Sequence, residues 1–253
     1  MIPKRIIPFF LVKEERLVKG ANFKDFIDVG DFLSQAMIYD AQGAEEIIIV
    51  DIEASARRGL IDTNIIERMI TRCRLPIAVG GGIKTLKDAR KCFMAGADKI
   101  VVNTQAILNP GFVMELADEF GAQSVVVSVD VRKNSKGNYD VYVFSGSKKA
   151  EIDLITLLKK IQDCGAGEIM ITSIDNEGTL SGFDIGLYEQ VRNLVRIPLI
   201  ASGGAGSYDN IVNLFRDADC DACALGKMLF LRDFDIVRIK AYLKGRKILV
   251  RDA

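Results

Sequence analysis

The chain holds 253 residues, 49% of them hydrophobic, with 34 basic side chains, 34 acidic side chains and no histidine. The balanced charge and the lack of a long basic run argue against nucleic acid or an anionic membrane as a partner. The N-terminal segment lacks the long apolar stretch of a signal peptide, and no run approaches the roughly 18 apolar residues of a membrane span. We therefore expect a cytoplasmic protein.

The absence of histidine limits the chemistry open to the chain. It excludes a Ser-His-Asp triad, a Cys-His pair and histidine-ligated zinc within this chain, so acid/base work falls to Asp, Glu, Lys, Tyr or Cys. The five cysteines are scattered. Cys220 and Cys223 form a single CxxC without a second one, which favours buried thiols over a zinc or redox site. We predict no metal and no cofactor.

Short apolar, β-branched runs alternate with amphipathic segments along the chain. The expected strands are 6–11, 47–52, 77–81, 99–103, 124–130, 169–173, 199–204 and 221–226. The expected helices lie near 31–43, 63–73, 85–95, 110–120, 152–164, 184–195, 207–217 and 233–244. Eight such alternations in about 250 residues predict a (β/α)8 TIM barrel that occupies residues 1–253 as one domain. A doubly wound open sheet is the alternative.

The two halves of the chain repeat each other. Gly82 precedes Gly204 by about 122 residues, and Leu11 precedes Asp130 by about 119. A nearly constant offset over four strand pairs predicts two duplicated half-barrels. Residues 131–151 interrupt the repeat after the fifth strand, and their alternating pattern around a Lys136-Gly137-Asn138 turn predicts a hairpin.

Two glycine-rich loops, 79–85 and 201–207, each follow a strand and precede a helix that Thr85 or Ser207 could cap. Glycines there let backbone N–H groups approach an anion, which predicts two phosphate cups at the barrel mouth. The alternative is that tight packing requires glycine for steric reasons. The expected cup residues are Gly81, Gly82, Asn103 and Thr104 on one side, and Ser202, Gly203, Gly204, Gly226 and Lys227 on the other.

Charged residues mark both ends of the predicted barrel. Arg5, Glu46, Lys99 and Glu168 stand at strand starts, where an ion-pair ring would stabilise the bottom of the barrel.

Carboxylates follow the strands at the mouth: Asp51, Asp130, Asp175 and Glu177. Each of them is a candidate acid or base, or a loop-capping group. Asp130, at the end of an otherwise apolar strand, is the best candidate. Its counterpart Leu11 cannot transfer a proton.

The segments RIIP, LVKG, VGGGI, VVNT, VVVSVD, GAGEI, TSID and IASGGAG occur in this order over nearly the whole chain. Together they resemble the cyclase subunit of imidazole glycerol phosphate synthase. The resemblance implies a partner glutaminase that docks on the barrel bottom. Its ammonia passes through the barrel to a bis-phosphorylated substrate at the mouth, where lyase and cyclisation steps yield imidazole glycerol phosphate and aminoimidazole carboxamide ribotide.

The resemblance also assigns roles to residues. It makes the bottom ring an ammonia gate, Asp98 a contact to the glutaminase, and Asp130 one of two catalytic aspartates. It places Lys19 in a mobile loop after the first strand. The substrate-binding residues that it implies are the cup residues above, with Lys19, Asp51, Asp175 and Gly178.

The chain departs from the family pattern at the mouth. Leu11 replaces the second catalytic aspartate, Glu177 replaces an aspartate, and Lys227 replaces a small polar residue. Loss of a general acid costs about 10²–10⁴ in rate. We therefore expect a paralogue of the kind found in surface-polysaccharide gene clusters, which passes ammonia to a third protein, an amidotransferase that makes acetamidino sugars. The alternatives are a histidine-pathway cyclase and a repurposed sugar-phosphate enzyme.

Overall fold

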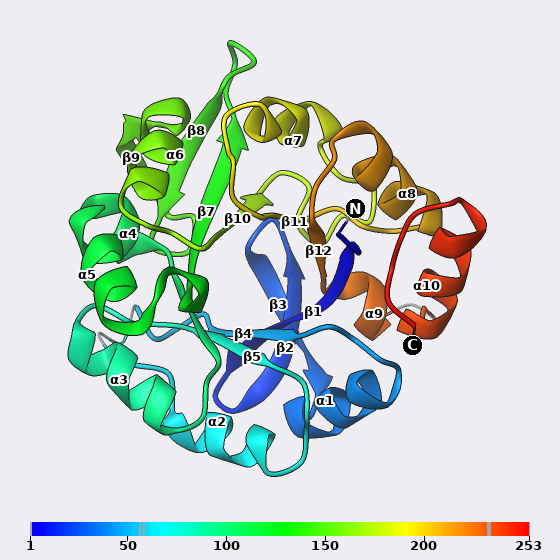
Figure 1. The fold of residues 1–253 in the computed structure, drawn as a ribbon, viewed down its shortest axis with the longest axis horizontal. Helices are drawn as coiled ribbons and strands as arrows, with labels where there is room; N and C mark the ends of the chain where they lie inside the picture. Colours follow the sequence, from blue (N-terminus) through cyan, green and yellow to red (C-terminus); the bar gives the residue numbers. More distant parts are fainter. Residues whose placement is uncertain (1, 56, 58, 232–233, 253) are drawn as a thin grey trace.

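The computed structural model describes residues 2–55, 57, 59–231 and 234–252. Within them, eight parallel strands close into a barrel, because β7 pairs with β10 at the end of the strand order (Figure 1). Around the barrel these strands are β1 (Arg5–Lys13), β4 (Ile47–Asp51), β5 (Ile77–Gly80), β6 (Lys99–Val102), β7 (Val125–Lys133), β10 (Glu168–Ser173), β11 (Leu199–Ser202) and β12 (Ala222–Leu225). The closure confirms the (β/α)8 prediction and excludes the open sheet.

Helices surround the barrel (Figure 1). They are α1 (Phe32–Ala41), α2 (Thr63–Ile70), α3 (Leu86–Met94), α4 (Thr104–Leu108), α5 (Gly111–Phe120), α6 (Leu154–Asp163), α7 (Ile185–Arg192), α8 (Tyr208–Asp217), α9 (Lys227–Leu231) and α10 (Ile236–Gly245), with a short 3₁₀ turn at Ala122–Ser124. Thr85 and Ser207 cap α3 and α8 through their side chains, as the sequence predicts. The short helices α4 and α9 are not foreseen by the sequence pattern.

Side chains that alternate along each strand divide the apolar residues into two clusters. The larger cluster lies between the strands and the helices. The smaller one fills the barrel interior with residues such as Ile7, Ile48, Val126 and Met170. Both faces of every barrel strand are therefore buried, which explains the nearly continuous apolar runs in the sequence.

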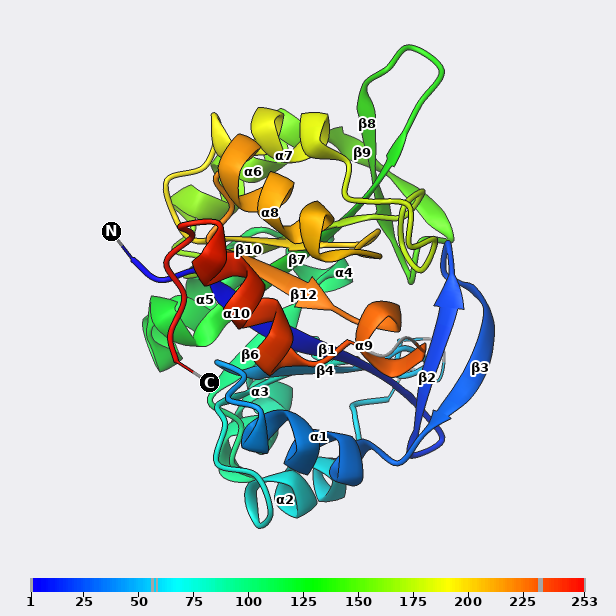
Figure 2. The ribbon, with the colours of Figure 1, turned by 90° about the vertical axis from the view of Figure 1, so that its right-hand side faces the viewer.

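Two antiparallel hairpins extend the barrel at its carboxyl end. One is the predicted insertion, in which β7 continues into β8 (Tyr139–Val143) and β9 (Lys148–Asp153). The other, β2 (Arg16–Ala21) with β3 (Lys24–Gly30), is missed by the sequence analysis. Figure 2 shows β2 and β3 at the end of the barrel opposite the two chain termini. The extension after β7 thus has a counterpart after β1.

Boundaries differ from the predicted ones where a neighbouring element or a glycine intervenes. β1 runs two residues beyond the expected end because Leu11, Val12 and Lys13 pair with β2. β11 stops at Ser202 because Gly203 and Gly204 have left-handed φ angles of 99° and 109°, which a strand cannot continue.

The two ends of the chain are joined by a buried ion pair. Lys240 of α10 lies 2.6 Å from Glu45 Oε1, and both side chains are almost entirely buried. Glu45 also accepts the backbone N–H of Ile6 through its other oxygen, at 2.8 Å. The pair therefore attaches the last helix to the first barrel strands.

Two kinds of feature are absent from the residues that the structure describes. No helix among them is long and apolar enough to cross a membrane. No group of three or more Asp, Glu or Cys side chains among them is placed to hold a metal ion. Cys220 and Cys223 are buried free thiols, and burial raises the pKa of Cys220 to about 12.

Replacement of Lys240 by methionine should lower the free energy of unfolding by about 3–5 kcal/mol, because the Glu45 carboxylate then stays buried without its partner. Denaturant unfolding measures this change. The control Lys244→Met, at a half-exposed site on the same helix, should change stability by less than about 0.5 kcal/mol. The double variant Glu45→Gln/Lys240→Met should recover much of the loss, and equal effects of the two lysine substitutions would contradict the prediction.

Candidate functional site

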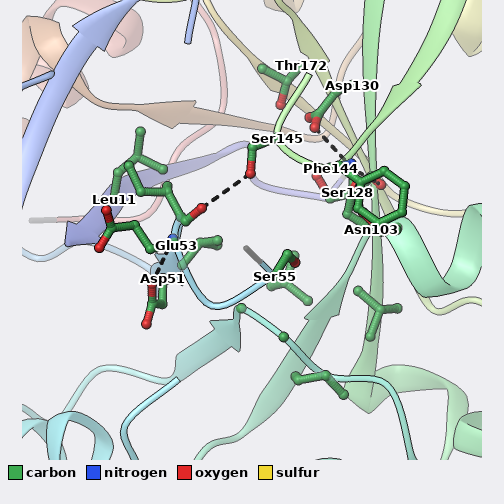
Figure 3. A pocket seen from close by; sticks show the side chains of 18 of the residues that line it. Leu11, Asp51, Glu53, Ser55, Asn103, Ser128, Asp130, Phe144, Ser145 and Thr172 are labelled. Atoms are coloured by element: carbon green, nitrogen blue, oxygen red, sulfur yellow. Dashed lines mark hydrogen bonds between the residues drawn. The ribbon is translucent and has the colours of Figure 1, made fainter. Parts of the chain in front are cut away.

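A cavity of about 450 Å³ opens at the carboxyl ends of β1, β4, β5, β6 and β7 (Figure 3). Its polar lining includes Asp51, Asn103, Thr104, Ser128, Asp130 and Thr172, and its apolar lining includes Phe9, Leu11, Phe23, Phe26, Leu108, Phe144 and Met170. The carboxyl end of the strands is where ligands bind in this fold, so this cavity is the candidate active site.

Asp130 is 8% exposed and lies at the end of the predicted strand, within the cavity wall. Its carboxylate accepts a hydrogen bond from Asn103 Nδ2 at 3.1 Å. Burial raises the pKa of Asp130 to about 7, and the nearby Glu177 charge adds to this, against the lowering effects of Asn103 and Thr172. A carboxyl group with that pKa can donate or accept a proton near neutral pH.

Leu11 lines the same cavity and lies on the other side of it from Asp130 (Figure 3). The leucine is buried with Phe9 and Val18 in the interior apolar cluster. The cavity wall is therefore apolar where the family resemblance places a second acid.

Asp51, the next candidate carboxylate, holds its own loop. It accepts the backbone N–H groups of Glu53 and Ala54 at 2.9 and 3.0 Å, and it forms an ion pair with Arg57. These contacts match the loop-capping alternative. They leave Asp51 in the cavity wall with its carboxylate occupied by partners.

Asp175 lies outside the cavity, on an exposed loop. Its carboxylate accepts the backbone N–H of Lys133 at 2.9 Å and lies 3.3 Å from Arg132. Nearby, a Cβ at Gly178 would lie 2.1 Å from the carbonyl oxygen of Gly20. Asp175 thus fastens the β7 extension, and Gly178 permits the β2 hairpin to approach the loop after β10.

The first glycine loop forms one wall of the cavity. Gly81 and Gly82 line it and are partly exposed, beside Asn103 and Thr104. A Cβ at Gly82 would also lie 1.8 Å from the carbonyl oxygen of Gly59. Gly82 therefore has a steric reason to be glycine, and it also lies where a ligand in the cavity could contact it.

The second glycine loop is covered. Ser202, Gly203 and Gly204 are buried, and a Cβ at Gly204 would lie 2.1 Å from the carbonyl oxygen of Gly182. Lys227 starts α9 and is partly exposed.

Lys19 occupies the space beside Gly226, where a Cβ on the glycine would lie 2.1 Å from Lys19 Nζ. Lys19 lies after the first barrel strand, as expected, but in strand β2 rather than in a loop, and it is 1% exposed. Its Nζ lies 3.8 Å from Glu177 Oε1 and 4.9 Å from the centre of the Phe9 ring. Burial lowers the pKa of Lys19, and the Glu177 charge opposes this.

The four charged residues at the barrel bottom form a closed ring. Arg5 bonds Glu46 at 3.0 Å and Glu168 at 2.5 Å, and Lys99 bonds the same two carboxylates at 2.8 and 2.5 Å. Burial alone would raise the pKa of Glu168, but the bonds from Arg5 and Lys99 lower it overall. Each of the two cations thus contacts both carboxylates.

Asp98 adjoins the ring on the outside. It is exposed, and its carboxylate accepts the backbone N–H of Ile77 at 2.8 Å. That bond orients the acidic group at the barrel bottom, where a partner surface can reach it.

Aromatic side chains over the mouth were not predicted from the sequence. Phe23 and Phe144 lie at the two hairpin turns, and Phe23 would meet a Cβ on Gly146 at 2.8 Å. The Phe144 N–H donates to Thr104 Oγ1 at 3.0 Å, and Ser145 donates to the carbonyl oxygen of Ile52. The sequence contained one signal for these aromatic residues. Each phenylalanine stands next to a turn, in a segment that follows a barrel strand.

Comparisons with known proteins agree with this geometry. The profile of the family described as "Histidine biosynthesis protein" matches residues 5–235. The imidazole glycerol phosphate synthase subunit HisF of Methanococcus vannielii is 39% identical, over 99% of this chain and 100% of its own length. The proteins of the same name from Alkaliphilus metalliredigens and Hydrogenobaculum sp. are 38% and 39% identical, again over 99% of this chain and 100% of theirs. The chain therefore belongs to the histidine biosynthesis protein family, and its resemblance to the cyclase subunit of imidazole glycerol phosphate synthase is confirmed.

Proposed function

We propose that this chain is a cyclase-type subunit of a glutamine amidotransferase that conducts ammonia from a glutaminase partner and has lost most of its own ring-forming chemistry. One observation supports this most directly. The ion-pair ring at the bottom is complete, whereas the mouth has Leu11 across the cavity from Asp130. A reaction that needs an acid and a base on opposite sides of its substrate lacks one of them.

The bottom of the barrel supports the partner. The relatives are named as subunits, which implies that they work within a larger enzyme. Asp98 is exposed beside the ring and held in place by Ile77, so it can meet a cation on a glutaminase. Arg5, Glu46, Lys99 and Glu168 then act as the gate through which ammonia enters.

The interior of the barrel suits a small neutral molecule. Apolar side chains fill it above the ring, and several of them are small, such as Ala78, Ala222 and Ala224. Ammonium would lose its hydration there at a high cost in free energy, while neutral ammonia would not. We therefore propose that ammonia, without its proton, travels from the ring to the mouth.

The acceptor of this ammonia is proposed to be a surface-polysaccharide sugar held by a separate amidotransferase, which makes an acetamidino group. This finer assignment rests on the missing acid at position 11. Sugar-modifying genes beside the gene for this chain would support the assignment, and histidine-pathway genes would contradict it.

A second candidate function is that of a working histidine-pathway cyclase. The full-length identity to subunits named HisF favours it, as does an Asp130 carboxyl group whose pKa is about 7. In that case the lone Asp130 would perform the proton transfers that the family divides between two aspartates.

Turnover of the phosphoribulosyl aminoimidazole carboxamide substrate with free ammonium separates the two candidates. The wild-type chain should be at least about 10²-fold slower than the Methanococcus vannielii relative measured alongside, because one acid is missing. Leu11→Asp should recover part of this rate. A wild-type rate equal to that of the relative would contradict the proposal.

The recovered activity should depend on pH in a defined direction. Asp130 must carry its proton to act as an acid, so the rate of Leu11→Asp should fall as pH rises above about 7. The double variant Leu11→Asp/Asp130→Asn serves as the control and should lose the recovered rate.

The docking surface gives a prediction about the partner. Addition of the chain to its glutaminase should raise the rate of glutamine hydrolysis, and Asp98→Lys should weaken this effect by at least about tenfold through repulsion of like charges. Asp98→Asn keeps an oxygen acceptor for the Ile77 N–H. This variant therefore separates the effect of the lost charge from the effect of a change in the local fold.

Asp25→Lys is the matched control for that charge reversal, because Asp25 is exposed on β3 at the opposite end of the barrel. This variant should activate the glutaminase as the wild type does. Equal losses for Asp25→Lys and Asp98→Lys would contradict docking at the bottom.

A further inference from the structure

Four large apolar side chains remain exposed around the mouth. They are Phe26 and Ile27 on β3, Leu108 at the end of α4 and Phe144 in the turn between β8 and β9, each 36–57% exposed. Three of them, Phe26, Leu108 and Phe144, also line the cavity. We call these four residues the mouth rim. A folded protein exposes single apolar side chains without consequence, but a group of them around one opening marks an interaction site.

The two hairpins make the mouth rim one surface. Both lie at the carboxyl end of the barrel (Figure 2), and their turns touch, because a Cβ on Gly146 would lie 2.8 Å from the Phe23 ring. Strand β3 forms the outer edge of this surface. It pairs with β2 alone among the described residues, and its residues 24–28 are all exposed. An edge strand with unpaired backbone groups and apolar side chains is a place where a second protein can bind.

The charges that border the mouth rim favour an acidic partner. Lys24, Lys84 and Lys148 are exposed there, and none of them has an ion-pair partner among the residues that the structure describes. Asp25, beside Lys24, offsets part of this charge, and the excess is positive. Asp98 at the bottom of the barrel is acidic instead, so the two ends select partner surfaces of opposite sign.

The proposed path of ammonia ends at this surface. The apolar cluster of the barrel interior and the lining of the open cavity share Phe9, Val101 and Met170. An amine in water near neutral pH carries a proton, and in that form it has no lone pair with which to attack a carbon. A protein that uses the ammonia must therefore cover the mouth and exclude water during the transfer. The acceptor of the ammonia is thus the partner that fits the mouth rim.

We infer that the mouth rim is the docking surface of the protein that accepts the ammonia, and that this acceptor presents an apolar face around its ammonia inlet, bordered by acidic side chains. The inference rests on the proposed function, namely that the ammonia leaves this chain for a separate amidotransferase. It adds the surface of contact and the chemistry of the partner face. A small bis-phosphorylated substrate can still enter when the acceptor is absent, because the cavity is open, so the inference agrees with the turnover expected of Leu11→Asp.

A reconstituted three-protein assay tests this inference. The chain, its glutaminase and the sugar amidotransferase encoded beside its gene are mixed with glutamine, and the amidated sugar formed per glutamine hydrolysed is measured. Ile27→Glu and Lys148→Glu each introduce a negative charge on a different hairpin at the mouth. Each should lower this ratio at least about fivefold, because the acidic face of the acceptor is repelled, and the missing nitrogen should appear as free ammonium. Activation of the glutaminase, at the other end of the barrel, should stay at the wild-type level.

Ile38→Glu is the matched control. It makes the same substitution at an isoleucine that is 45% exposed, compared with 53% for Ile27, but on α1 at the outer wall of the barrel. This variant should keep the wild-type ratio of amidated sugar to hydrolysed glutamine. Surface plasmon resonance should show that the acceptor binds Ile27→Glu and Lys148→Glu at least about tenfold more weakly than it binds the wild type and Ile38→Glu. Circular dichroism verifies that all three variants fold.

Three results would overturn the inference. If the two variants at the mouth deliver ammonia as the wild type does, the acceptor docks elsewhere, although the ammonia-conducting function stands. Equal losses for Ile38→Glu and Ile27→Glu would mean that the mouth rim has no special part in docking. A dimer of the chain in analytical ultracentrifugation that Ile27→Glu dissociates would make a second copy the occupant of the rim. If glutamine yields no amidated sugar although the glutaminase is activated, the proposed acceptor is wrong, and the inference fails together with that part of the proposed function.

Discussion

Exclusion of water from the barrel interior constrains every charged group at both ends of this protein. A charge in such a place must be paired or must lose its charge, because its hydration is gone. At the bottom the constraint is met by pairing, since Arg5 and Lys99 each bond both Glu46 and Glu168. At the mouth it is met by a raised pKa, which leaves Asp130 close to half protonated at neutral pH.

Lys19 shows the same constraint in a third form. The side chain is almost fully buried, its pKa is lowered by burial, and its nearest charge is the Glu177 carboxylate. The ion-pair ring at the bottom, the raised pKa of Asp130 and the lowered pKa of Lys19 thus have one physical origin. Leu11 fits this pattern as well, because an apolar residue at the mouth needs no partner at all.

The two hairpins decide what the mouth can hold. The β2–β3 hairpin carries Lys19 into one side and is bonded to the loop after β10 through Asn22. The β8–β9 turn covers the other side, where the Phe144 N–H reaches Thr104. One hairpin thus places a lysine beside Gly226, and the other places the Phe144 ring in the wall of the cavity.

Much of the architecture was predictable from periodicity, since apolar runs buried on both faces and the amphipathic helices between them specify a parallel barrel. The β2–β3 hairpin was not, because its turn depends on a left-handed φ angle of 63° at Phe23, which a phenylalanine adopts rarely. The sequence correctly predicted that Asp130 lies at the mouth. It also predicted correctly that the four charged residues at the bottom form a ring of ion pairs. The role of Asp175 depended on the backbone N–H of Lys133, 42 residues away along the chain, which no local pattern reveals.

The sequence by itself determined the barrel, the family and the absence of an acid at position 11, because these depend on residue types and on local periodicity. Only the tertiary structure decided which of the two glycine loops is exposed. Gly81 and Gly203 each begin a Gly-Gly pair at the end of a barrel strand, yet Gly81 lines an open cavity and Gly203 is buried. The carbonyl oxygen of Ser173 and the backbone of Glu177 lie against Gly203, and they reach it only when β10 and β11 pair as neighbours in the closed barrel.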